Sequence, residues 1–128
     1  MSGTTCIAVV DDDEATLEAM AGLIRTFGYR VVAFSCAEDF LAFGNRVEIG
    51  CLIADMQMPG MTGLDLHARL VVGGETTPTI LITAFPDQGA RTRALKAGVK
   101  SYLTKPVSCR DLHACIQSAL GSGDPCYP

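Results

Sequence analysis

Residues 51–60, with the sequence CLIADMQMPG, join a short apolar run to an acid and then to a pair of chain-breaking residues. The run Cys51–Ala54 shows no polar alternation, which is typical of a strand buried on both faces of a parallel sheet. Asp55 follows directly, and the Pro59-Gly60 pair marks a turn. The stretch VVDD at residues 9–12 repeats the pattern of an apolar run ending in acids. We therefore expect buried strands that carry carboxylates at their ends.

Short apolar runs alternate along the chain with segments whose apolar residues recur at helical spacing. The expected strands are Cys6–Val10, Arg30–Phe34, Cys51–Ala54, Thr79–Thr83 and Ser101–Leu103. Alternating strands and helices with short connections predict an α/β fold, a doubly wound parallel sheet with right-handed crossovers. In such sheets the binding site lies beyond the carboxyl ends of the strands.

Several helix starts are marked by a hydroxyl residue with an acid three positions later, a pattern typical of helix N-termini. The three pairs are Ser35 with Glu38, Thr62 with Asp65, and Ser108 with Asp111. The segment Asp87–Ala97 has mostly alanine at its inward positions. Because it buries little apolar surface, we expect it to be the most loosely held helix.

The composition indicates one globular domain. The chain has 128 residues, is 48% hydrophobic and carries a net charge of -4. We expect the domain to occupy residues 1–120, with residues 121–128 as a disordered tail or the start of a linker. The acidic balance predicts no direct contact with nucleic acid. No apolar run approaches the roughly 20 residues that span a bilayer, and no signal peptide is visible, so we expect a cytoplasmic protein without membrane contact.

The six cysteines contain no C-x-x-C spacing, and only two histidines accompany them. We therefore expect neither a zinc site nor a disulfide framework. Most of the cysteines lie in apolar segments, where a thiol behaves as a small hydrophobe.

Polar residues follow the expected strands and should meet at one edge of the sheet. They are Asp11 and Asp12, Asp55, Thr83 and Lys105. Two carboxylates about 4 Å apart repel each other by roughly 4 kcal/mol at an effective dielectric of about 20. A hard divalent cation with oxygen ligands would offset this repulsion, and Mg²⁺ is the natural candidate.

The same set of residues suits phosphoryl transfer. An aspartate can act as nucleophile toward phosphorus, while a metal ion, a lysine and a hydroxyl meet the charge on the phosphoryl oxygens. Lys105 and Thr83 supply the last two groups. Asp13 and Glu14 are better explained as acids at the N-terminus of the following helix.

The chain resembles bacterial two-component response-regulator receiver domains from residue 5 to about residue 120. The matching segments are VVDDDE at 9–14, ADMQMPGMTG at 54–63, the Thr83-Ala84 pair, and YLTKP at 102–106. The segments AEDFLAF and LKAGVKSYLTKPV are similar to the FixJ subgroup. The resemblance implies a flavodoxin-like fold with a five-stranded parallel sheet, strand order 2-1-3-4-5, and five helices.

The resemblance also implies site residues. Asp55 would be the phosphoacceptor, Mg²⁺ would be held by Asp12 directly, Asp11 through water, Asp55, and the backbone carbonyl of Gln57. Gln57 and Phe85 occupy positions that vary in the family and tune the lifetime of the phosphoryl group.

Four further residues take roles from the resemblance. Thr83 and Lys105 would bind the phosphoryl group, and Ala84 would leave room for it. Tyr102 would be the switch residue, whose ring turns inward when Thr83 moves. Lys105-Pro106 matches the family's cis peptide.

The resemblance implies a receiver that accepts a phosphoryl group from a sensor histidine kinase or a phosphotransfer protein. Such a chain is not an enzyme beyond its own phosphorylation and dephosphorylation. Phosphorylation would reshape the face formed by residues 87–120, through which we expect a homodimer or a partner contact. Two alternatives stay open: a single-domain receiver, which we slightly favour, and the receiver of a FixJ-like transcription factor.

Two other classes share parts of this pattern. A magnesium-dependent phosphatase with an aspartate nucleophile shows a D-x-D pattern, whereas Gln57 stands at the second acidic position here. A flavin-binding electron carrier needs a hydroxyl- and glycine-rich loop after the first strand. Residues 11–14 are all acidic instead and would repel a phosphate.

Overall fold

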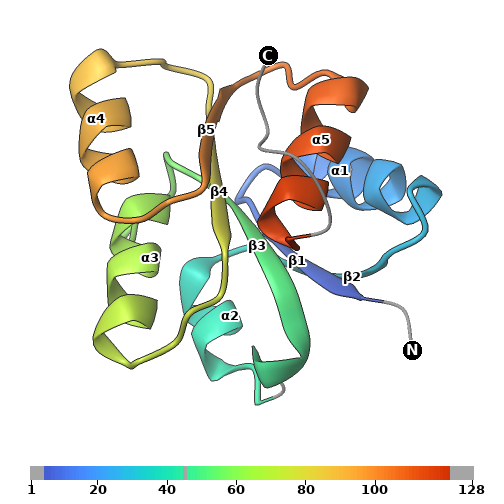
Figure 1. The fold of residues 1–128 in the computed structure, drawn as a ribbon, viewed down its shortest axis with the longest axis horizontal. Helices are drawn as coiled ribbons and strands as arrows, with labels where there is room; N and C mark the ends of the chain where they lie inside the picture. The colour runs from blue at the N-terminus through green and yellow to red at the C-terminus, as the bar shows by residue number, and fades with distance from the viewer. Residues whose placement is uncertain (1–4, 45, 122–128) are drawn as a thin grey trace.

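The computed structural model describes residues 5–44 and 46–121, which build a central sheet with helices on both faces (Figure 1). The strands are β1 (Cys6–Val10), β2 (Arg30–Phe34), β3 (Ile49–Asp55), β4 (Thr79–Thr83) and β5 (Ser101–Thr104). All neighbouring strands pair in parallel, in the order β2-β1-β3-β4-β5. The expected doubly wound sheet and its strand order are confirmed.

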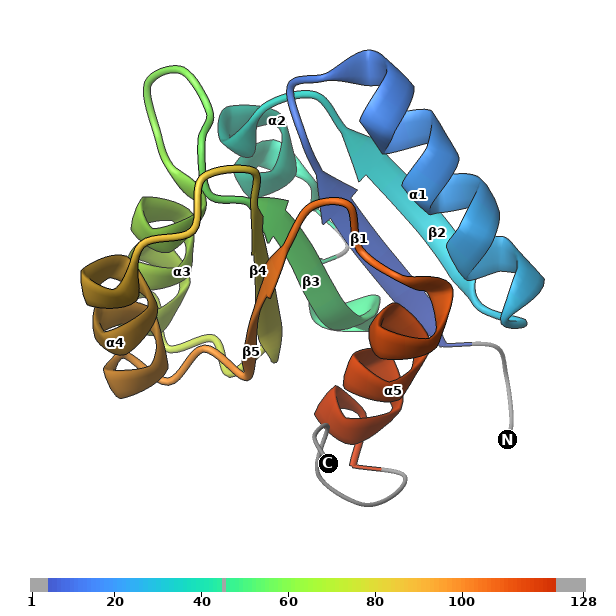
Figure 2. The ribbon, with the colours of Figure 1, turned by 90° about the horizontal axis from the view of Figure 1, so that it is seen from above.

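Helices cover the two faces of the sheet unequally. They are α1 (Glu14–Thr26), α2 (Ala37–Ala42), α3 (Gly63–Val72), α4 (Gln88–Lys96) and α5 (Cys109–Ala119), with a short 3-10 helix at Arg46–Glu48. Figure 2 shows α1 and α5 on one face, and α2, α3 and α4 on the other. Of the predicted tail, residues 121–128, residues 122–128 lie outside the described residues.

Alternation along each strand divides the core into two layers. In β1, Ile7 and Val9 pack with residues of α1 and α5, whereas Ala8 and Val10 pack with residues of α2, α3 and α4. Because successive side chains of a strand point to opposite faces, each inner strand needs apolar residues at every position. The edge strand β2 is only partly buried. The prediction that each strand is buried on both faces is therefore wrong for β2.

Most of the expected helix starts are confirmed. The side chains of Asp13, Thr62 and Ser108 each accept a hydrogen bond from the backbone N–H three residues later. The start expected at Ser35 is wrong by one residue, because the N-cap of α2 is Cys36 and its side chain makes no capping hydrogen bond.

Helix α4 buries only Ala90 and Ala94, as its sequence predicts. Among the described residues, no helix is long and apolar enough to cross a membrane. The cysteines match the expectation only in part: Cys6, Cys36, Cys51 and Cys109 are free, but Cys115 is disulfide-bonded. The sequence spacing gave no sign of that bond.

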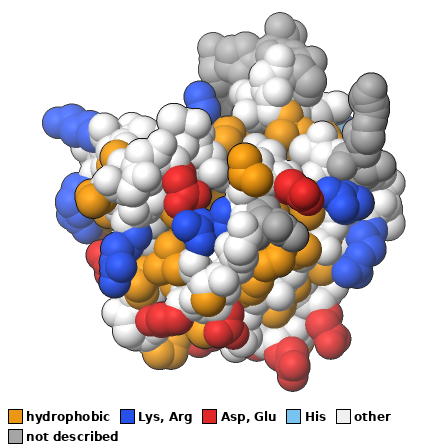
Figure 3. Space-filling view, turned by 90° about the horizontal axis from the view of Figure 1, so that it is seen from below, with side chains coloured by type: hydrophobic (Ala, Val, Ile, Leu, Met, Phe, Trp, Pro, Cys, Tyr) orange, Lys and Arg blue, Asp and Glu red, His pale blue; other side chains and the backbone are white. Residues whose placement is uncertain are grey.

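Loops after β1, β3, β4 and β5 gather at one end, where the acidic residues follow the strands (Figure 2). The face seen from below mixes acidic, basic and hydrophobic side chains (Figure 3). Val47 and Val72 are the most exposed of the large hydrophobic residues described, at 93% and 88%.

Candidate functional site

Asp11, Asp12 and Asp55 form an acidic cluster at the carboxyl ends of β1 and β3. One carboxylate oxygen from each lies within 4.8 Å of the others. Asp11 and Asp55 are buried, at 3% and 6% exposure, whereas Asp12 is exposed. The fold therefore brings together three acids that lie as much as 44 residues apart in the sequence (55 minus 11).

Backbone amides fix the two buried carboxylates. The amide of Asp13 donates to Asp11 Oδ1 at 2.9 Å, and the amide of Gln57 donates to Asp55 Oδ1 at 2.9 Å. Each bond spans two residues, so the turn that follows the strand orients the acid at its end. The start of α3 packs tightly here, because a Cβ on Gly63 would lie 2.6 Å from the Asp55 carbonyl oxygen.

Lys105 joins the two buried acids. Its Nζ donates to Asp55 Oδ2 at 2.8 Å and to Asp11 Oδ2 at 3.0 Å, with 20% of its side chain exposed. The following peptide bond, Lys105-Pro106, is cis, as the resemblance implies. The lysine therefore supplies one positive charge between two carboxylates that would otherwise repel each other.

The site shifts the proton affinities of its members. Burial raises the pKa of Asp11 above its usual value, although hydrogen bonds from the Asp13 amide and from Lys105 oppose this effect. For Lys105, burial acts to lower the pKa, but the hydrogen bonds to Asp55 and Asp11 outweigh it and the pKa is raised. The lysine is therefore charged at neutral pH.

Thr83 ends β4 and is fully buried. Its hydroxyl donates to the side-chain oxygen Oε1 of Gln57 at 2.6 Å and accepts from the amide of Phe85 at 3.0 Å. The contact of the Gln57 side chain with Thr83 was not predicted from the sequence. Nothing in the sequence pairs residues 57 and 83; their contact depends on the adjacency of β3 and β4. Ala84, next to Thr83, is exposed.

Tyr102 lies on β5 opposite Leu81 of β4. It is only 7% exposed, and its carbonyl accepts a hydrogen bond from Arg91 Nη1 of α4 at 3.3 Å. Tyr102 is therefore buried in this conformation, and the inward turn of its ring when Thr83 moves stays a prediction.

The donors of the acidic cluster suit a hard cation. All three side chains offer carboxylate oxygens, and no described histidine or cysteine belongs to the group. Each carboxylate oxygen has two acceptor positions, so the bonds from Lys105 and the amides leave capacity for a metal. Oxygen-only sets of this kind bind Mg²⁺.

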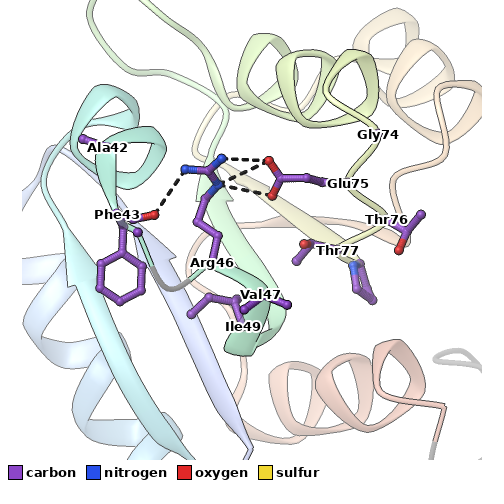
Figure 4. Close-up of a pocket in the computed structure, with 11 residues that line it drawn as sticks. Ala42, Phe43, Arg46, Val47, Ile49, Gly74, Glu75, Thr76 and Thr77 are labelled. Atoms are coloured by element: carbon purple, nitrogen blue, oxygen red, sulfur yellow. Dashed lines mark hydrogen bonds and ion pairs between the residues drawn. The ribbon is translucent and has the colours of Figure 1, made fainter.

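A depression of about 650 Å³ lies at the amino end of the sheet, beside Phe43 and Pro78 (Figure 4). Arg46 crosses it and donates to both carboxylate oxygens of Glu75, at 2.9 to 3.3 Å. It also donates to the carbonyls of Leu41 and Phe43. With these contacts Arg46 joins the end of α2 to the α3–β4 loop, which is a structural role.

Comparison with known proteins places this geometry in a family. Residues 7–117 match the model of the response regulator receiver domain. Response regulator protein TmoT from Ectopseudomonas mendocina is 43% identical over 114 residues, covering 89% of this chain and 52% of the relative. Transcriptional regulatory protein FixJ from Azorhizobium caulinodans is 32% identical over 115 residues, covering 90% and 54%.

The solved structures agree. The crystal structure of FixJ-N superposes with a TM-score of 0.85 at 30% identity, covering 97% of this chain and 98% of that one. The chain spans about half the length of the curated relatives it matches. Both the sequence and the arrangement of acids and lysine at the carboxyl ends of the strands lead to one conclusion: the chain belongs to the response regulator receiver domain family, whose members carry signals in two-component systems by phosphorylation of an aspartate.

Proposed function

We propose that Asp55 is the phosphoacceptor of this receiver. The observation that carries the proposal is the double contact of Lys105 Nζ with Asp55 and Asp11. An aspartate nucleophile needs a nearby cation to meet the charge that develops on the phosphoryl oxygens. The Lys105 ammonium lies 2.8 Å from Asp55. Asp55 is also the acid that ends a central strand. The small, exposed Ala84 on the neighbouring loop leaves space for an incoming group.

We infer that the acidic cluster holds Mg²⁺, with Asp11, Asp12 and Asp55 as carboxylate ligands and the Gln57 carbonyl as a further oxygen ligand. When bound, the ion would neutralise charge on the phosphoryl oxygens. The three acids have oxygen atoms within 4.8 Å of one another. Among the described residues, one lysine contacts them, so negative charge exceeds positive charge in the cluster, which supports this inference.

In the proposed transfer, a carboxylate oxygen of Asp55 forms a bond to phosphorus while the bond from phosphorus to the donor nitrogen breaks, and the nitrogen takes up a proton. Lys105 pairs with the phosphoryl oxygens, and the Thr83 hydroxyl donates to one of them. The chain catalyses only its own phosphorylation and dephosphorylation, so it is a signalling protein and not a turnover enzyme.

The donor is proposed to be a sensor histidine kinase or a phosphotransfer protein. A mostly apolar groove of about 380 Å³ between α1 and α5 opens beside Lys105, and its lining includes Met20 and Leu112. A partner helix that carries the phosphohistidine could pack there while its imidazole reaches Asp55. The matched segment covers 52% and 54% of two relatives, one of which is named a transcriptional regulatory protein. This supports a role in transcriptional regulation, and a single-domain receiver is the alternative.

The output is proposed to pass through Thr83 and Tyr102 to α4. Arg91 of α4 contacts the carbonyl of Tyr102, and α4 buries only two alanines. A helix with so little buried surface can shift at low cost. We propose that the face formed by residues 87–120 then binds a partner or a second copy of the chain.

The test is phosphorylation by acetyl phosphate with Mg²⁺, followed by intact mass measurement. We expect one phosphate adduct in the wild type and none in Asp55→Asn. Asp39→Asn is the matched control, because Asp39 is an exposed aspartate on α2, and it should still form the adduct. An adduct that persists in Asp55→Asn would move the phosphoacceptor to another residue.

A further inference from the structure

In this conformation Thr83 donates to the side chain of Gln57 the hydrogen bond that it would otherwise offer to a phosphoryl oxygen. A hydroxyl has a single donor proton, and in this conformation Thr83 donates it to Gln57 Oε1 at 2.6 Å. The Phe85 amide donates to the same hydroxyl at 3.0 Å and takes up one of its acceptor positions. The hydroxyl is therefore held from two sides, with its proton directed to Gln57.

We propose that Gln57 is a positioning residue that stabilises the unphosphorylated state by accepting this proton. The inference rests on the proposed roles of Asp55 and Thr83. A phosphoryl oxygen and Gln57 Oε1 cannot both accept the only proton of Thr83, so phosphorylation must displace the glutamine side chain. The resting hydrogen bond therefore opposes activation by the free energy of that bond.

The location of Gln57 suits this competition. Its backbone amide donates to Asp55 Oδ1 at 2.9 Å, so one residue contacts both the acceptor carboxylate and Thr83. Thr83 is fully buried, whereas Gln57 is exposed. An exposed side chain can swing into solvent and exchange one hydrogen bond for another with water. The resting contact is thus both specific and displaceable.

The test is the affinity of the protein for beryllium fluoride, a mimic of the phosphoryl group, measured by calorimetry with saturating Mg²⁺. Gln57→Met keeps the side-chain length but removes the strong acceptor. Losing a hydrogen bond worth about 0.5–1.5 kcal/mol should tighten beryllium fluoride binding by about 2- to 10-fold. Affinity at equilibrium is used because the rate of dephosphorylation also depends on water access.

A double-mutant cycle isolates the proposed contact. In a Thr83→Val background the hydroxyl is absent, so Gln57→Met should leave the affinity unchanged there. Gln88→Met is the matched control, since Gln88 is an exposed glutamine on α4, and should bind like the wild type.

Each outcome separates the hypotheses. Equal or weaker beryllium fluoride binding by Gln57→Met overturns the positioning role, and so does a gain that persists in the Thr83→Val background. The proposed function stands in both cases if the wild type binds beryllium fluoride and forms the Asp55 adduct. A wild type that does neither overturns the proposed function, and the role of Gln57 with it.

Discussion

Replacing Lys105 with methionine should strongly destabilise the metal-free protein. The ammonium lies 2.8 Å from Asp55 Oδ2 and 3.0 Å from Asp11 Oδ2. Breaking a buried pair by removing one partner costs about 3–5 kcal/mol. Because 20% of the lysine side chain is exposed, we take the lower end, about 3 kcal/mol, which lowers Tm by roughly 10 °C in a chain of this size.

Most of this cost should come from the repulsion between the acids left behind. With carboxylate oxygens of Asp11 and Asp55 within 4.8 Å, that repulsion is about 3–4 kcal/mol at an effective dielectric of about 20. Adding Asp55→Asn to Lys105→Met removes one of the two charges. The double variant should therefore regain most of the lost stability.

The assay is urea unfolding at neutral pH in the presence of a chelator. Lys100→Met, at an exposed lysine, is the control and should change stability by less than about 0.5 kcal/mol. The reasoning fails if Lys105→Met lowers the free energy of unfolding by the same amount in the wild type and in the Asp55→Asn background. Equal costs would mean that the lysine stabilises the fold by packing and not by pairing with the acids.

Three further predictions follow from other contacts. Mg²⁺ should raise the Tm of the wild type, whereas Asp12→Asn should melt higher without metal and lose that response; a thermal melt with and without Mg²⁺ checks this, and an unchanged response would remove Asp12 from the ligands. His67 is 5% exposed, its Nδ1 lacks a hydrogen-bond partner, and burial lowers its pKa. The unfolded chain then binds the proton more readily, so stability should be complete above the unfolded pKa of about 6.5 and fall below it by up to about 1.4 kcal/mol per pH unit. Urea titrations across this range should show a weaker pH dependence of the unfolding free energy in His67→Leu than in the wild type, and an equal pH dependence in both would contradict the assignment. Arg46→Met should cost about 1–2 kcal/mol, because it removes a partly exposed bidentate pair and two carbonyl contacts; Glu75→Gln should add little in that background, and full additivity of the two costs would argue against the pair.

The sequence predicted the local structure well because its signals are local. Four of the five expected strands begin at the observed residue, and the caps at Thr62 and Ser108 form as expected. The start at Ser35 failed because a neighbouring residue, Cys36, took the N-cap position without any side-chain hydrogen bond. A capping pattern indicates where a helix can begin, but packing of the helix selects the residue.

The disulfide at Cys115 and the contact between Gln57 and Thr83 were beyond the reach of local patterns. Neither has a spacing signature, since each depends on which segments the fold brings together. The burial of Tyr102 belongs to the same class. Its proposed role as the switch residue came from the family resemblance, whereas its burial depends on the packing of α4 against β5.

By itself, the sequence determined which residues can carry the chemistry: acids just after β1 and at the end of β3, a hydroxyl at the end of β4 and a lysine just after β5. It did so because strand and helix periodicity, and the residues at strand ends, are readable over a few positions. Only the tertiary structure decided the contacts among them, such as Lys105 with Asp11 across 94 residues. Those contacts depend on the order of strands in the sheet, which brings distant strand ends within hydrogen-bond distance. The same order places Lys105 where its positive charge offsets the negative charges of the buried acids.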